Sequence, residues 1–184
     1  MTGRQREAER TLSELRIFEV LAKYHPVLTG TVPLGLDVDS SDLDIVCEAH
    51  DLDEFEQDVS RAYGWYPGFE THRTESMGFP ASVVNFQTTC FPIQIFAQAI
   101  PVHRQRAYRH LIVESRLLQL AGEEARAALR QLREQGMKTE PAFAHYFRLE
   151  GDPYERLYEL ADASDEELLA LIAAAARDRQ RDAN

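Results

Sequence analysis

The spacing of hydrophobic residues predicts alternating helices and strands in the first half of this chain. Helical spacing is kept within residues 7–24 by Leu12, Leu15, Phe18, Leu21 and Ala22. Alternating or β-branched runs predict strands at residues 27–29, 43–47, 68–75, 81–88 and 92–98. Asp51 is placed to cap a further helix that continues to about Gly64. The first half is therefore expected to form a sheet with flanking helices.

From His103 onward the hydrophobic period is helical to the end of the chain. Glycines and an Asp-Pro pair divide this part into predicted helices at 103–121, 123–135, 139–149, 153–162 and 164–180. The pattern predicts an α/β (α+β) fold, with a small mixed sheet and flanking helices followed by a helical C-terminal half. We expect a sheet core over residues 1–100 and a helical region over residues 101–184 that packs on it.

Composition narrows the class of protein. With 44% hydrophobic residues among 184, the chain has enough apolar surface for a core, which excludes general disorder. The net charge of −11 argues against binding to membranes or to long nucleic acids. Cys47 and Cys90 are too few for a disulfide framework, and the polar N-terminus lacks the apolar core of a signal peptide. These features predict a cytoplasmic, soluble protein.

Two aspartates beside a glycine turn are the strongest sign of chemistry. Asp42 and Asp44 lie two residues apart at the start of a predicted strand, so their side chains should point to one face. Neighbouring carboxylates repel one another unless a cation neutralises them, and Mg²⁺ (or Mn²⁺) prefers such oxygen ligands. Upstream, Gly30 allows a phosphate to approach the backbone and Thr31 offers it a hydroxyl. The spacing predicts a site for metal and a nucleoside triphosphate, although an ordinary turn and a solvated strand edge would give the same residues.

A Gly-Thr turn followed by an Asp-x-Asp strand resembles the start of the nucleotidyltransferase (polymerase β-like) superfamily. The chain also resembles an uncharacterised bacterial family of nucleotidyltransferase-like proteins, through the segments 30–35, 41–45, 95–98, 105–114 and 138–143. The resemblance implies a nucleotidyltransferase-type sheet and a Mg²⁺-dependent transfer of a nucleoside monophosphate from an NTP to a hydroxyl. It makes Asp42 and Asp44 the metal ligands and catalytic residues. The sequence leaves open the acceptor, the nucleotide and the oligomeric state.

One position departs from the superfamily pattern. The resemblance implies a third carboxylate on a later strand, where this chain has Gln94. An amide can offer an oxygen to a metal or nucleotide, but it cannot accept a proton as a base. The alternative hypothesis is therefore a catalytically impaired module that binds nucleotide or a protein partner.

The densest basic segment of the chain, residues 103–110, supplies further candidates. Arg106, His110 and Glu114 follow one another at helical steps of four. Arg106 and His110 are candidate nucleotide-binding residues, with Glu114 positioning them or replacing the missing acid, and a purely structural ion pair is the alternative. The expected buried face of this helix consists of Ala107, Leu111, Ser115 and Leu118, with Glu114 at its border.

Overall fold

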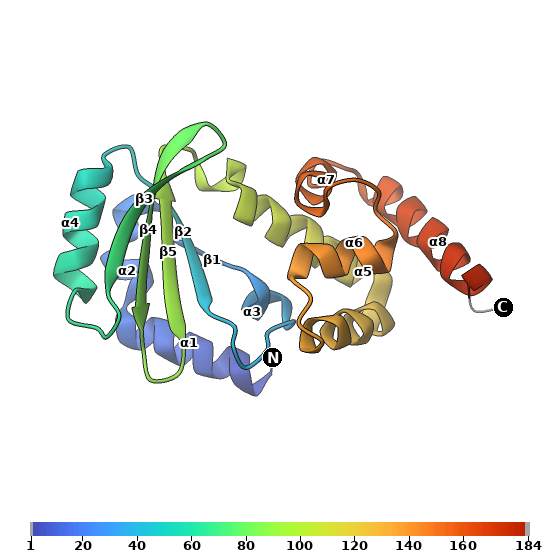
Figure 1. Ribbon diagram of the computed structural model, residues 1–184, viewed down its shortest axis with the longest axis horizontal. Coiled ribbons are helices and arrows are strands. Elements are labelled where there is room, and N and C mark those ends of the chain that lie inside the picture. The colour runs from blue at the N-terminus through green and yellow to red at the C-terminus, as the bar shows by residue number, and fades with distance from the viewer. Residues whose placement is uncertain (1, 183–184) are drawn as a thin grey trace. The chain divides into compact units, whose positions relative to one another are not determined.

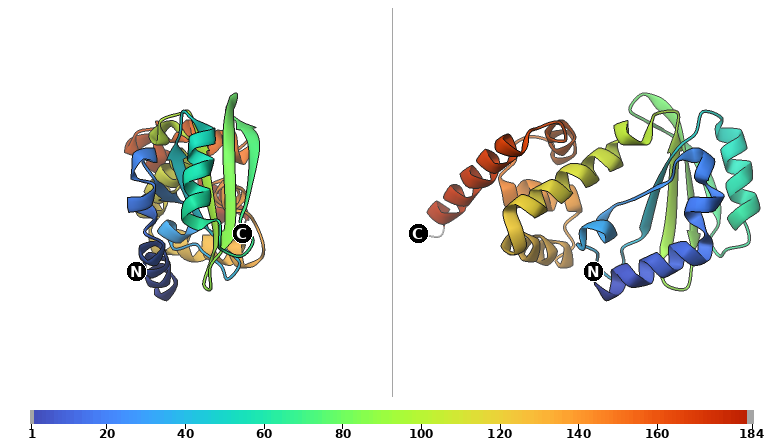
Figure 2. Two further views of the ribbon diagram at one scale, coloured as in Figure 1. Left: turned by 90° about the vertical axis from the view of Figure 1, so that its left-hand side faces the viewer. Right: turned by 180° about the vertical axis from the view of Figure 1, so that it is seen from behind.

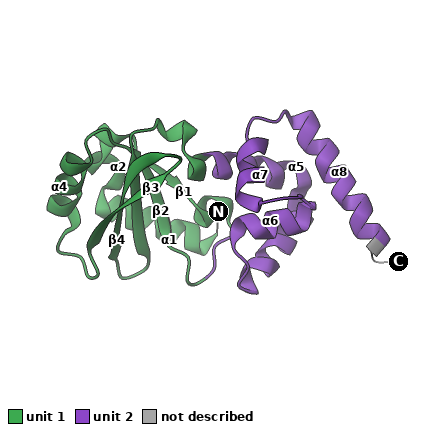
Figure 3. Ribbon diagram, turned by 45° about the horizontal axis from the view of Figure 1, so that its top comes forward, with its two compact units in different colours: residues 1–35, 39–108 green, residues 36–38, 109–184 purple. Residues whose placement is uncertain are grey.

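The computed structural model describes residues 2–182 and divides into two compact units (Figure 3). The sheet unit contains residues up to Gly35 together with Asp39–Tyr108, and the helical unit contains Leu36–Val38 and the residues from Arg109 onward. The sheet unit has the elements α1 (Gly3–Leu15), α2 (Ile17–Val20), η1 (Ala22–Tyr24), β1 (Val27–Thr29), α3 (Thr31–Leu34), β2 (Leu43–Glu48), α4 (Leu52–Tyr63), β3 (Glu70–Ser76), β4 (Phe79–Gln87), β5 (Pro92–Gln98) and η2 (Val102–Arg104). Within residues 2–182, no helix is both long and apolar enough to cross a membrane.

The five strands form one mixed sheet in the order β1-β2-β5-β4-β3 (Figure 1). Strands β2 and β5 run parallel, and every other neighbouring pair is antiparallel. The predicted mixed sheet and helical C-terminal half are confirmed, and the predicted strands agree with the observed ones to within about two residues.

One face of this sheet carries the hydrophobic core of the unit. Helices α1 and α4 lie on that face (Figure 2), and the strands contribute alternate, fully buried residues such as Ile45, Ile93 and Val84. Since successive strand residues point to opposite faces, the intervening positions face away from α1 and α4. That second face bears the candidate site.

The prediction of one uninterrupted helix over residues 7–24 is wrong, because the helix is broken within this range. Helix α1 begins at a capping box between Thr2 and Gln5 and ends at Arg16, whose backbone is left-handed with φ 51°. The turn redirects the chain into α2 and η1, which place Ile17 and Leu21 in the core with no exposed surface. Hydrophobic spacing alone does not reveal such a break because the apolar stripe continues across it.

The helical unit contains nearly all of α5 (Arg106–Glu134), followed by α6 (Thr139–Phe147), α7 (Pro153–Leu160) and α8 (Asp165–Asp182). The predicted helices 103–121 and 123–135 are the two parts of α5, which is non-helical at Gly122. Asp152 caps α7 by accepting hydrogen bonds from the N–H groups of Tyr154 and Glu155.

Candidate active site

A row of polar residues crosses the second face of the sheet, one from each strand. Strand register pairs them in sequence across the sheet: Thr29, Asp44, Gln94, Asn85 and Glu70. We call these five residues the polar row. Directly paired strand residues share a face, so the row brings together positions far apart in the chain.

Asp42 and Asp44 stand at the amino-terminal end of β2, separated by the fully buried Leu43. Both aspartates are half-buried. Asp44 belongs to β2, whereas Asp42 lies one residue before the strand begins, close to where β1 ends. That the two side chains share one face stays a prediction from the sequence spacing.

Gly30 forms the turn between β1 and α3 and lies directly against Asp44. Its backbone has φ 75° and ψ −156°, a conformation that only glycine adopts readily. A Cβ atom at this position would collide with Oδ2 of Asp44 and lie 3.2 Å from its Cγ. The absence of a side chain at Gly30 is therefore what allows the Asp44 carboxylate to occupy its position.

Thr31 ties the same turn to the start of β2. Its hydroxyl oxygen lies 3.2 Å from the hydroxyl of Ser41, which is buried and precedes Asp42. On the neighbouring strand, the hydroxyl of Thr29 donates a 3.3 Å hydrogen bond to the backbone carbonyl of Asp44. Both contacts fix the aspartate segment against the glycine turn.

Gln94 lies beside Asp44 on the parallel strand β5 and is half-buried. Its amide nitrogen lies 3.2 Å from Oδ1 of Asn85, and the amide nitrogen of Asn85 lies 3.2 Å from Oε1 of Glu70. Neither Asn85 nor Glu70 was a candidate from the sequence. The signal for them exists only in the strand register, because β4 and β3 contain no motif that singles them out.

The donors at this site suit a hard cation better than a soft one. Within residues 2–182 there is no group of three or more His, Cys, Asp or Glu side chains that could hold a metal ion. Mg²⁺, however, is commonly held by one or two carboxylates together with waters and substrate phosphates. Asp42 and Asp44 offer carboxylate oxygens and Gln94 an amide oxygen, so the three candidate donors are all oxygen atoms. The residues present therefore fit Mg²⁺ or Mn²⁺ bound together with a nucleotide.

The structure does not bring Arg106 to the same end of the parallel strands. Asp44 and Gln94 lie in the amino-terminal halves of β2 and β5, whereas Arg106 begins α5 beyond the carboxyl end of β5. Arg106 is half-buried at that position.

His110 belongs to the helical unit, where partners surround its ring. Its Nδ1 lies 3.2 Å from Oε1 of Glu140 and its Nε2 lies 2.9 Å from the carbonyl oxygen of Tyr154. The side chain is 6% exposed, so neither ring nitrogen is presented to a ligand. These contacts favour the structural interpretation of this residue.

Glu114 is more deeply buried than expected. Residues His110, Val113, Glu114, Leu117 and Leu118 form the buried face of this part of α5. The predicted buried face was wrong for Ala107 and Ser115, which are exposed. The helix packs instead through the face that carries His110 and Glu114. Burial raises the pKa of Glu114 well above its usual value, as does the neighbouring charge of Glu140, while Arg133 opposes the rise.

Glu140 behaves differently from Glu114. Burial disfavours its charged form, but the hydrogen bond with His110 and the bond to its own backbone N–H prevail and lower its pKa. We call His110, Glu114, Arg133 and Glu140 the His110 cluster. Within it His110 and Glu140 share a hydrogen bond, whereas Oε1 of Glu114 and Nε of Arg133 are buried without a hydrogen-bond partner.

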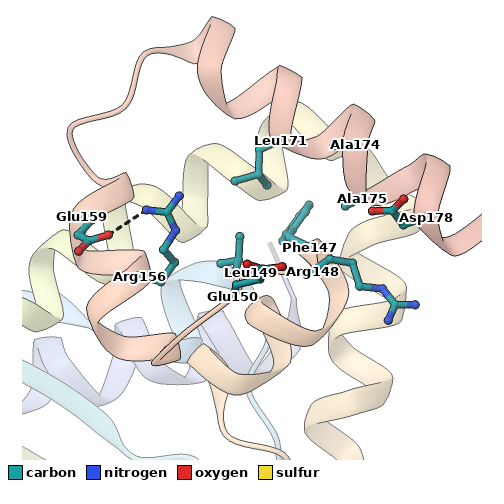
Figure 4. Close-up of a pocket in the computed structure, with 10 residues that line it drawn as sticks. All are labelled: Phe147, Arg148, Leu149, Glu150, Arg156, Glu159, Leu171, Ala174, Ala175 and Asp178. Atoms are coloured by element: carbon teal, nitrogen blue, oxygen red, sulfur yellow. Dashed lines mark hydrogen bonds and ion pairs between the residues drawn. The ribbon is translucent and has the colours of Figure 1, made fainter.

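A separate groove of about 510 Å³ lies within the helical unit (Figure 4). It is lined by the segment after α6, by α7 and by α8, and an ion pair of 2.8 Å joins Arg156 to Glu159 at one side. None of the candidate site residues lines it.

Comparison with known proteins places this chain in a family. A family model described as a domain of unknown function (DUF4269) matches residues 10–160. The chain belongs to that family. No curated protein matches it.

Solved structures share the fold of this family member. Cid1, described as an RNA terminal uridylyl transferase, aligns with a TM-score of 0.54 at 14% identity, covering 79% of this chain and 47% of Cid1. Cid1 poly(U) polymerase with MgGTP bound aligns with a TM-score of 0.54 at 14% identity, over 85% of this chain and 49% of that one. A chain of the GLD-2/RNP-8 complex aligns with a TM-score of 0.51 at 13% identity, over 94% of this chain and 77% of that one.

The chain thus spans about half the length of the Cid1 structures. At these identities the likeness concerns the fold.

Proposed function

We propose that this protein is a Mg²⁺-dependent nucleotidyltransferase that moves a nucleoside monophosphate from an NTP to a hydroxyl acceptor. The observation that carries the proposal is the close packing of the Asp44 carboxylate against the backbone of Gly30. With Asp42 two residues earlier, we infer a pair of carboxylates beside a glycine turn whose backbone a phosphate can approach. The fold shared with Cid1, which is described as an RNA terminal uridylyl transferase, supports the same reaction class.

In this mechanism Asp42 and Asp44 hold the cation, and Gly30 and Thr31 seat the phosphates. The bound metal supplies charge neutralisation at the phosphates. The acceptor oxygen forms a bond to the α-phosphorus, the bond to the departing pyrophosphate breaks, and the hydroxyl proton is released. The Gln94 amide cannot take that proton, so an aspartate or solvent must accept it.

A second function is favoured by the same glutamine. If no base assists the acceptor, the site binds a metal–nucleotide complex without turning it over. Gln94→Glu separates the two functions: a gain of transfer in the variant indicates a binding module, and equal transfer in both proteins indicates an active native enzyme.

The first test is thermal unfolding with each NTP, with and without Mg²⁺ or Mn²⁺. A nucleotide at a hundred times its dissociation constant stabilises the folded state by about 2.7 kcal/mol, which corresponds to a rise in Tm of roughly 5–10 °C for a chain of this length. We expect a metal-dependent shift with at least one nucleotide that Asp44→Asn abolishes. The matched control is Glu75→Gln, which removes an exposed charge on β3 and should retain the shift. If no nucleotide shifts the native protein, or if Asp44→Asn retains the shift, the proposed function is wrong.

A further inference from the structure

The hydrogen bonds along the polar row fix the direction of each amide. An ionised carboxylate only accepts hydrogen bonds, so at Glu70 the neighbouring Asn85 must present its NH₂ group. The oxygen of Asn85 then faces Gln94, which must in turn present its own NH₂ group. The order of donors and acceptors therefore runs in one direction, from Gln94 through Asn85 to Glu70.

This direction decides which atom Gln94 offers to Asp44. Strand β5 lies between β4 and β2, so Gln94 has Asn85 on one side and Asp44 on the other. With its nitrogen turned to Asn85, the amide keeps its oxygen for the side of β2. A reversed amide would instead present NH₂ to that side, and an NH₂ group cannot ligate a cation.

We propose that Asn85, held by Glu70, is a positioning residue that turns the carbonyl oxygen of Gln94 toward the Asp42–Asp44 pair as a neutral third ligand for a divalent cation. The inference rests on the proposed function and deepens it. A carboxylate at position 94 would need no such positioning, because it offers an oxygen atom from either side. The amide of Gln94 offers oxygen from one side only and therefore has to be oriented. Residues that orient a metal ligand in this way commonly contribute 10–100-fold to metal affinity.

The experiment measures binding of Mn²⁺ alone by titration calorimetry, using the full chain. Asn85→Ala removes the acceptor that fixes Gln94, and we expect an affinity about tenfold weaker. The same substitution in a Gln94→Leu background should have no effect, because Asn85 acts only through Gln94. Gln87→Ala, an exposed amide two residues further along β4, is the matched control and should bind as the native protein does.

Glu70→Gln provides a second, milder variant at an exposed position. Glutamine there can donate or accept, so the Asn85 and Gln94 amides lose their fixed direction. If the two orientations become equally populated, the apparent dissociation constant rises about twofold. This effect should also vanish in the Gln94→Leu background.

The outcomes separate the inference from the proposed function. Failure of the native protein to bind Mn²⁺ alone would overturn the inference, whereas the proposed function is overturned only if nucleotide gives no metal-dependent thermal shift. If binding depends on Asp44 but is unchanged by Asn85→Ala and Glu70→Gln, only the positioning role is wrong. If Asn85→Ala weakens binding equally with and without Gln94, Asn85 acts directly or through the fold, and the inference is also overturned.

Discussion

The polar row of the sheet unit and the His110 cluster of the helical unit both gather acidic and amide or imidazole groups, yet their surroundings differ. Asp42, Asp44 and Gln94 are half-buried beside a glycine turn. His110 and Glu114 are buried, and the ring of His110 is occupied on both sides by Glu140 and a backbone carbonyl. The comparison favours the polar row over the His110 cluster as a candidate ligand site, because several side chains of the row are partly exposed whereas both ring nitrogens of His110 have protein partners.

The largest expected effect concerns His110→Ala. The substitution removes both hydrogen bonds of the ring and leaves the buried Glu140 carboxylate without its histidine partner, which should lower the free energy of unfolding by about 3 kcal/mol. Urea denaturation measures this loss. The metal-dependent thermal shift with nucleotide should survive.

The exposed His103 provides the control, since His103→Ala should change neither stability nor nucleotide binding. If His110→Ala abolished nucleotide binding without changing stability, the structural interpretation of His110 would be wrong. His110 would then be a nucleotide-binding residue.

Gly30→Ala should affect both stability and the site. The backbone strain at φ 75° and ψ −156° costs about 2 kcal/mol for a residue with a side chain. The added methyl group would also displace the Asp44 carboxylate, so Mn²⁺ affinity should fall together with stability.

Gly78 offers a matched position in the hairpin between β3 and β4. It has φ 76°, and nothing lies within 4 Å of the position a Cβ would occupy. We expect Gly78→Ala to lose about 1 kcal/mol of stability and to bind Mn²⁺ normally. Equal Mn²⁺ affinity in the two alanine variants would show that contact between Gly30 and Asp44 does not shape the site.

The smallest expected effect is on the pH dependence of stability. Because the pKa of Glu114 is raised by burial, the folded protein keeps this proton while the unfolded chain loses it above about pH 4.5. The contribution of Glu114 to the free energy of unfolding therefore decreases as the pH rises from that value toward the pKa of Glu114 in the folded protein. Glu114→Gln removes this contribution and should gain about 1 kcal/mol near pH 8, with little difference from the native protein at pH 4.

Denaturation of both proteins from pH 4 to pH 8 measures the difference. Glu140, whose pKa is lowered, contributes in the opposite sense: its stabilisation is present above the unfolded pKa and is lost as the pH falls through the folded one. Parallel stability curves for the native protein and Glu114→Gln would show that Glu114 is ionised in the folded state.

Much of the fold could be predicted from the sequence because its signals are local. The predicted strand at 92–98 coincides with β5, and Gly122 interrupts α5 where two helices were expected to meet. The break at Arg16 was missed because a left-handed residue leaves no trace in the hydrophobic spacing. The buried face of α5 was wrong because neighbouring helices, which the sequence does not reveal, decide which side of a helix they cover.

The sequence by itself predicted that Asp42 and Asp44 share a face, since side chains alternate along a strand for covalent reasons. It also indicated the glycine turn that precedes them. Only the tertiary structure decided that the Asp44 carboxylate packs on Gly30, and that Gln94, Asn85 and Glu70 continue the row. Strand order and register depend on hydrogen bonds and packing between segments that are distant in the chain, and no local pattern encodes them.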